Sequence, residues 1–73
     1  MPLKPLPFRA VRRKLLAAGF AEVGQEGSHI KFARRTMEGT VTTVVSRHSE
    51  VTVGTLSSVL RQAGISPEVW DAL

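Results

Sequence analysis

The spacing of the apolar residues changes at Gly19, and this change constrains the fold more than any other feature of the sequence. Before Gly19, apolar side chains recur with the three-to-four spacing of an amphipathic helix. These side chains are Phe8, Val11, Leu15 and Ala18. Pro7 suits the first turn of this helix, where no backbone N–H is needed, and Gly19 suits its end. Prolines at positions 2, 5 and 7 predict an extended leader over residues 1–6.

After Gly19 the pattern predicts three strands joined by short turns. The strands are expected at residues 20–26, 28–35 and 40–46, with tight turns at residues 26–28 and 37–39. In the second strand the apolar Ile30 and Phe32 point to one face, because side chains alternate along a strand. The other face carries His29, Lys31 and Arg35. The third strand is rich in Val and Thr, which favour strands.

The last third of the chain predicts two more helices. Thr52 can cap the first of them after a polar loop at residues 47–51, and Gly64 ends it. Its apolar stripe is formed by Leu56, Val59, Leu60 and Ala63. The run Ser66-Pro67-Glu68 is a second start signal. A short C-terminal helix is then expected, anchored by Val69, Trp70 and Leu73.

The predicted order is therefore helix, three strands, helix and a short C-terminal helix, which is an α+β arrangement. Three consecutive strands joined by short turns form an antiparallel meander. Such a sheet buries one face beneath the helices and leaves the other in water. The double-stranded-RNA-binding fold has this layout, and we expect one such domain over residues 1–73.

The formal net charge is +4, and it is concentrated in the first half of the chain. Residues 1–35 contain eight Lys and Arg against two Glu, whereas residues 36–73 contain two Arg against four acids. A basic half on a small domain indicates a polyanionic partner, with nucleic acid as the first candidate. A charged face that serves only solubility is the other interpretation.

The chain has no cysteine, so neither a disulfide nor a thiolate zinc site can stabilise this small domain. The absence of cysteine also fits a reducing cytosol. The N-terminus lacks the apolar segment of a secretory signal, and the longest nearly apolar run, residues 15–21, is too short to cross a bilayer. We therefore expect a cytoplasmic protein. Its 42% of apolar residues predict a folded rather than a disordered chain.

His29 is the first candidate for catalysis. It follows a Gly-Ser turn on the polar face of the second strand, with Lys31 and Arg35 expected as neighbours and Arg34 at the strand end. A histidine can take up and release a proton near neutral pH. RNA carries its own nucleophile, the 2′-hydroxyl, so cleavage needs a base, an acid for the leaving 5′-oxygen and cations for the charge on phosphorus. An exposed strand histidine without a function is the alternative.

Other polar residues allow two interpretations each. His48, in the loop before the second long helix, is either a second acid–base group or phosphate contact, or a loop residue that helps to cap the helix. The cations of the first helix either clamp phosphates or form its solvated side. They are Arg9, Arg12, Arg13 and Lys14.

Neither a metal nor a cofactor is expected. The six acidic residues form no close cluster, and the two histidines stand nineteen residues apart, without the spacing of a ligand motif. The sequence also lacks a phosphate-binding loop and a Gly-rich dinucleotide turn.

Five motifs occur in a distinctive order between about Val11 and Trp70. They are Gly19-Phe20, Gly27-Ser28-His29, Val44-Val45-Ser46-Arg47-His48, Gly54-Thr55-Leu56 and Leu60-Arg61-Gln62-Ala63-Gly64-Ile65-Ser66. In order and spacing they resemble the HicA-like toxin family. The Gly-Ser-His turn together with the two helix motifs indicates this family far more specifically than the turn or the helix motifs would alone.

The resemblance implies an mRNA interferase of a type II toxin–antitoxin system, with a double-stranded-RNA-binding-like fold. It implies RNA cleavage without metal by the histidine of the Gly-Ser-His motif, which is His29 here. It also implies a HicB-like antitoxin that covers the active face. Two positions depart from the family. Ser46 stands where proline is frequent, which loosens the turn toward His48, and Val53 is a mild change before the Gly-Thr-Leu motif.

Three hypotheses follow. In the first, the chain is an RNA-cleaving toxin in which His29 is the acid or base, and cations bind the RNA. These cations are Lys31, Arg35, Arg34, Arg12 and Arg13. In the second, it is a non-catalytic module that binds double-stranded RNA and needs basic residues but no central histidine. In the third, the sheet serves only a protein partner.

Overall fold

The computed structural model describes residues 3–73 and confirms the predicted α+β order. Its elements are α1 (Phe8–Ala17), β1 (Ala21–Glu26), β2 (His29–Thr36), β3 (Gly39–Ser46), α2 (Val53–Ala63) and α3 (Pro67–Ala72). Residues 1 and 2 of the expected leader lie outside the described residues. The rest of the leader is not helical, and Leu6 pairs with Val51 through an isolated antiparallel bridge.

The three strands form an antiparallel sheet in the order β1-β2-β3, as expected for a meander. A two-residue turn at Gly27-Ser28 joins β1 to β2, so that Glu26 pairs with His29. On the other side of β2, His29 pairs with Ser46. The β1–β2 register shifts by one residue between Glu22 and Gly24, which marks a β-bulge.

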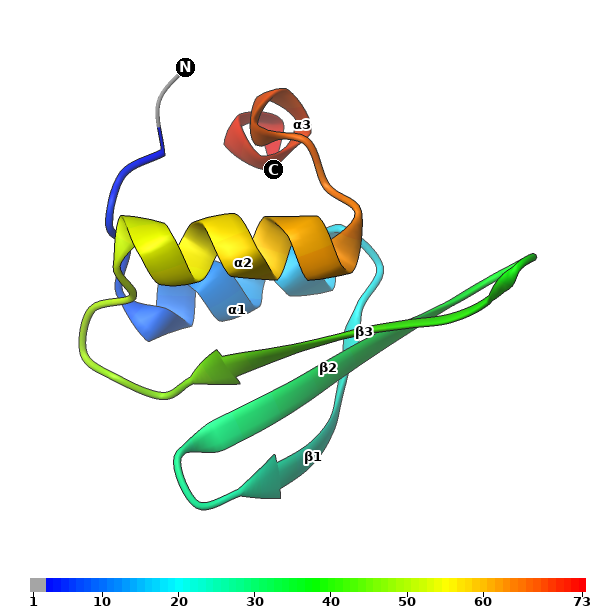
Figure 1. Ribbon diagram of the computed structural model, residues 1–73, viewed down its shortest axis with the longest axis horizontal. Coiled ribbons are helices and arrows are strands. Elements are labelled where there is room, and N and C mark those ends of the chain that lie inside the picture. The colour runs from blue at the N-terminus through cyan, green and yellow to red at the C-terminus, as the bar shows by residue number, and fades with distance from the viewer. Residues whose placement is uncertain (1–2) are drawn as a thin grey trace.

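Both long helices lie against one face of the sheet (Figure 1). The alternation of β2 explains this arrangement, because Ile30 and Phe32 are buried while His29 and Lys31 are exposed. Apolar side chains of the sheet and of α1, α2 and α3 form a single core. Its buried members are Val11, Leu15, Phe20, Ile30, Phe32, Val45, Val51, Leu56, Val59, Leu60, Ala63 and Trp70. The opposite sheet face, called here the open face, has no helix over it in the part of the chain described.

The helices end where the sequence predicts. The Thr52 hydroxyl accepts a hydrogen bond from the Thr55 N–H at 3.4 Å and caps α2. After α1, Gly19 adopts a φ of +95°, and the Phe20 N–H donates to the Leu15 carbonyl at 3.0 Å. This six-to-one hydrogen bond is typical of a glycine-terminated helix, and it brings Phe20 into the core directly above Leu15.

The short helix α3 lies on the side of α1 and α2 that faces away from the sheet (Figure 1). Trp70 anchors it as predicted, but the prediction for Val69 is wrong, since 53% of Val69 is exposed. Lys14 also departs from expectation. Instead of joining the solvated side of α1, its Nζ donates to the carbonyls of Trp70 and Leu73 at 2.9 and 3.2 Å. A lysine at this position complements the negative end of α3.

Among residues 3–73, no helix has both the length and the apolar character that a membrane crossing requires.

Phe32 is fully buried at the centre of the sheet, so its truncation should destabilise the domain strongly. We expect Phe32→Ala to lower the free energy of unfolding by about 3–5 kcal/mol. A domain of this length has only roughly 4–11 kcal/mol in total. Urea denaturation followed by circular dichroism measures the change. Met37→Ala is the control, because Met37 lies fully exposed in the β2–β3 turn, and it should leave the urea midpoint unchanged.

Candidate functional site

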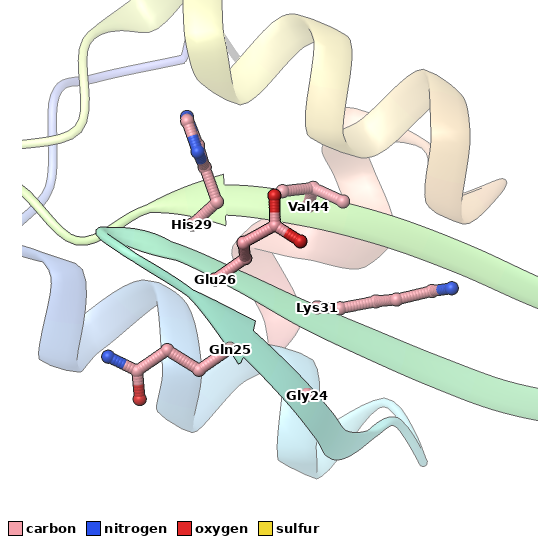
Figure 2. A pocket seen from close by; sticks show the side chains of 6 residues that line it. All are labelled: Gly24, Gln25, Glu26, His29, Lys31 and Val44. Atoms are coloured by element: carbon pink, nitrogen blue, oxygen red, sulfur yellow. The ribbon is translucent and has the colours of Figure 1, made fainter.

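A hollow of about 530 Å³ opens at the His29 end of the sheet. It is lined by Gly24, Gln25, Glu26, His29, Lys31 and Val44 (Figure 2). All three strands contribute to it, and each lining residue is exposed to solvent. A ligand could therefore enter without any rearrangement of the chain. We call this feature the His29 hollow.

His29 owes its position to the turn that precedes it. Gly27 adopts a φ of +60°, which glycine reaches without strain, and the two-residue turn then starts β2 at His29. The turn is tied to the third strand, because the Arg47 N–H donates to the Ser28 carbonyl at 2.6 Å. The imidazole is exposed as predicted, on the side of the sheet opposite the buried Ile30.

Glu26 is a site residue that the sequence reasoning missed. It is the register partner of His29, so their Cβ atoms lie about 5 Å apart. In Figure 2 both side chains rise from the hairpin, while Gln25 points the other way. The signal was available in the sequence, because the residues on either side of a two-residue hairpin turn always face each other. The His29 hollow thus contains a carboxylate beside the imidazole.

Lys31 lies in the hollow as predicted, opposite Val44 of β3. It projects along the sheet away from His29 (Figure 2). Arg35 is exposed on the same face, but the expectation that it neighbours His29 is wrong. Arg35 lies six positions beyond His29 along β2, which places the two about 20 Å apart. Lys31 is therefore the cation of β2 that reaches the hollow.

Arg34 does not share the open face. Arg34 lies two residues after Phe32, so both side chains point to the helix-covered face. There the Arg34 guanidinium lies 5.3 Å from the centre of the Phe20 ring. Its Nε is buried and has no hydrogen-bond partner. A cation stacked on an aromatic ring covers apolar surface as well as carrying charge. Arg34 therefore contributes to packing at the end of α1 and does not contact the His29 hollow.

The remaining predicted cations come from the helix layer. Arg12 donates to Glu22 at 3.1 Å across the gap between α1 and β1, and Arg13 is exposed on α1. His48 is also exposed, and it lines a separate hollow near the start of α1. Its backbone N–H donates to Ser46, while the cap of α2 is Thr52. None of these three residues lines the His29 hollow.

Over residues 3–73, His, Asp and Glu side chains nowhere gather in a group of three or more that could hold a metal ion.

The packing role of Arg34 predicts an asymmetry between two substitutions. Arg34→Met keeps an unbranched side chain over Phe20 and removes the unpaired Nε, so the free energy of unfolding should change by less than about 1 kcal/mol. Arg34→Ala uncovers the Phe20 ring and should cost more than Arg34→Met. Thermal denaturation of both variants, with Arg35→Ala as an exposed control, measures the difference. An equal loss of stability in the Met and Ala variants would contradict the packing role.

Comparison with known proteins identifies the family. A search among curated proteins found no match. A family profile described as the HicA toxin of bacterial toxin–antitoxin systems matches residues 8–65, from the start of α1 to just beyond α2. The match covers all three strands and the whole His29 hollow. The chain therefore belongs to the HicA toxin family.

Proposed function

We propose that this chain is a metal-independent endoribonuclease that cleaves mRNA in the cytoplasm as the toxin of a toxin–antitoxin pair. The observation that carries the proposal is the His29 hollow, which an exposed imidazole, a carboxylate and a lysine line together. His29 and Glu26 can each transfer a proton, and the Lys31 ammonium can bind phosphate. Membership of a toxin family supports the biological role.

The reaction needs no nucleophile from the protein. The 2′-hydroxyl oxygen of RNA attacks the adjacent phosphorus, the bond from phosphorus to the 5′-oxygen breaks, and a 2′,3′-cyclic phosphate forms. One protein group removes the 2′-hydroxyl proton, and another delivers a proton to the departing 5′-oxygen. We assign both transfers to the pair of His29 and Glu26. The Lys31 ammonium stabilises the negative charge on the phosphate oxygens.

Glu26 makes the pair chemically sufficient. A single imidazole must accept one proton before it can donate one, whereas two neighbouring groups can accept one proton and donate another in the same step.

We further propose that the inactivating partner is a HicB-like antitoxin that covers the His29 hollow. The hollow lies on the open face, which no other part of the described chain covers. An exposed Val44 at its edge offers apolar area to such a partner. A covered hollow could not admit RNA, so binding of the antitoxin and binding of substrate would exclude each other.

Replacement of His29 by alanine should abolish cleavage. Purified wild-type chain, incubated with a defined RNA in excess EDTA, is expected to produce fragments with cyclic-phosphate ends, and His29→Ala should lower the rate by about 10²–10⁴-fold. Arg61→Ala is the control, because Arg61 is exposed in the last turn of α2 and lies outside the His29 hollow, and it should cleave at the wild-type rate. RNA binding without cleavage by the wild type would instead favour a non-catalytic module.

Glu26→Gln preserves the shape of the side chain and removes its charge and its proton exchange. We expect kcat to fall at least tenfold, with a smaller change in KM, because the group acts on protons rather than on substrate affinity. Glu38→Gln, in the distant β2–β3 turn, is the control. A Glu26→Gln enzyme with the wild-type kcat would remove Glu26 from the mechanism.

A further inference from the structure

A second cationic surface lies beside the first turn of α1. Two hollows of about 430 and 410 Å³ share three lining residues there, namely Phe8, Arg9 and Arg47. His48 lines one of the two hollows, and Arg12 lines the other. We call the surface formed by Phe8, Arg9, Arg47 and His48 the Phe8 surface. Two segments far apart in the sequence build it, the start of α1 and the loop after β3.

The arginines of the Phe8 surface form no salt bridge within residues 3–73, although the Glu22 carboxylate lines one of the two hollows. Across residues 3–73 the structure contains one salt bridge, between Arg12 and Glu22. The side chains of Arg9 and Arg47 donate no hydrogen bond to any described residue. Arg47 is nevertheless held in place, because its guanidinium lies 6.0 Å from the centre of the Phe8 ring. A guanidinium positioned in this way keeps its N–H groups available for a phosphate.

The N-terminal end of α1 adds to the positive electrostatic potential of this surface. No acidic residue occurs in its first turn, and Pro7 offers no side-chain cap. The unpaired N–H groups of the first turn therefore leave a partial positive charge beside Arg9. Arginines from two segments and the positive end of a helix thus converge on one hollow surface, which suits a phosphate diester.

The Phe8 surface and the His29 hollow lie at the same end of the sheet, on opposite faces. Ser46 pairs with His29, and the next residue, Arg47, bonds through its N–H to the Ser28 carbonyl. Because side chains alternate, Arg47 points toward α1 while His29 points to the open face. The β1–β2 turn and the end of β3, joined by this hydrogen bond, lie between the two sites. A flexible single strand can pass around this turn, whereas a stiff duplex cannot bend so sharply.

We infer that the Phe8 surface binds a phosphate of the RNA strand next to the nucleotides held in the His29 hollow. This inference rests on the proposed ribonuclease function and adds to it a binding subsite on the helix side of the sheet. Arg9 and Arg47 bind the phosphate, and the exposed side of the Arg47 guanidinium offers a plane on which a base can stack. The substrate is then a single strand that turns around the Gly27-Ser28 hairpin.

The salt dependence of RNA affinity tests this subsite. We would measure the Kd of a fluorescent single-stranded RNA at several salt concentrations, using His29→Ala protein to prevent cleavage. Each phosphate contact with a single strand contributes about 0.7 to the slope of log K against log salt. Arg9→Gln and Arg47→Gln should each reduce the slope by about 0.7 and the double variant by about 1.4. Arg61→Gln, an exposed cation in the last turn of α2, removes the same charge elsewhere and should leave the slope unchanged.

Two further measurements separate the possible outcomes. Thermal denaturation shows whether Arg47→Gln loses the stacking on Phe8, and the exposed Arg9 gives an independent variant if it does. Cleavage by the protein with an intact His29 is assayed with the same RNA. Cleavage with an unchanged slope in both variants would overturn the subsite and leave the ribonuclease proposal standing. A reduced slope without cleavage would support the subsite and overturn the ribonuclease proposal. A variant that loses affinity for the antitoxin, and not for RNA, would assign the Phe8 surface to the protein partner.

Discussion

Burial of Ile30 and Phe32 beneath α1 and α2 determines the direction of every other side chain of β2. In a strand, a residue cannot change face unless its neighbours do so too. The core contacts therefore hold His29 and Lys31 on the open face without any contact of their own to fix them there. The same constraint carries Arg34 to the helix side, where it stacks on Phe20. The site is specified by hydrophobic packing on the face opposite to it.

The order of elements and the exposure of His29 could be predicted from sequence because they depend on local signals. Gly19 and Gly64 adopt positive φ angles and follow the ends of α1 and α2, as the apolar periodicity indicated. Thr52 and Ser66 act as caps through hydrogen bonds to residues three positions ahead. Each of these features involves residues within one turn of a helix or one step of a strand, so no knowledge of the tertiary structure was required.

The errors arose where a residue's role depends on a distant partner or on distance itself. Lys14 has the spacing of a solvated helix residue, yet it bonds to carbonyls 56 and 59 positions away. Arg35 has the right parity to join His29, but parity carries no information about separation along a strand. Glu26 faces His29 across a two-residue turn, and its place in the hollow follows from that pairing rather than from any pattern within its own strand. The alternation along a single strand does not show which side chains of neighbouring strands meet.

The bulge at Val23 has a consequence for the charge of the two faces. Glu22 and Glu26 are four positions apart, and in a regular strand they would lie on the same face. The inserted residue separates them, so that Glu22 meets Arg12 on the helix side while Glu26 meets His29 on the open side. Deletion of Val23 would therefore not simply shorten a strand. It would move a second carboxylate onto the face that carries the proposed RNA-cleaving site and release Arg12 on the opposite face. One residue without a functional group thus determines how β1 divides its negative charge between the two sides of the protein.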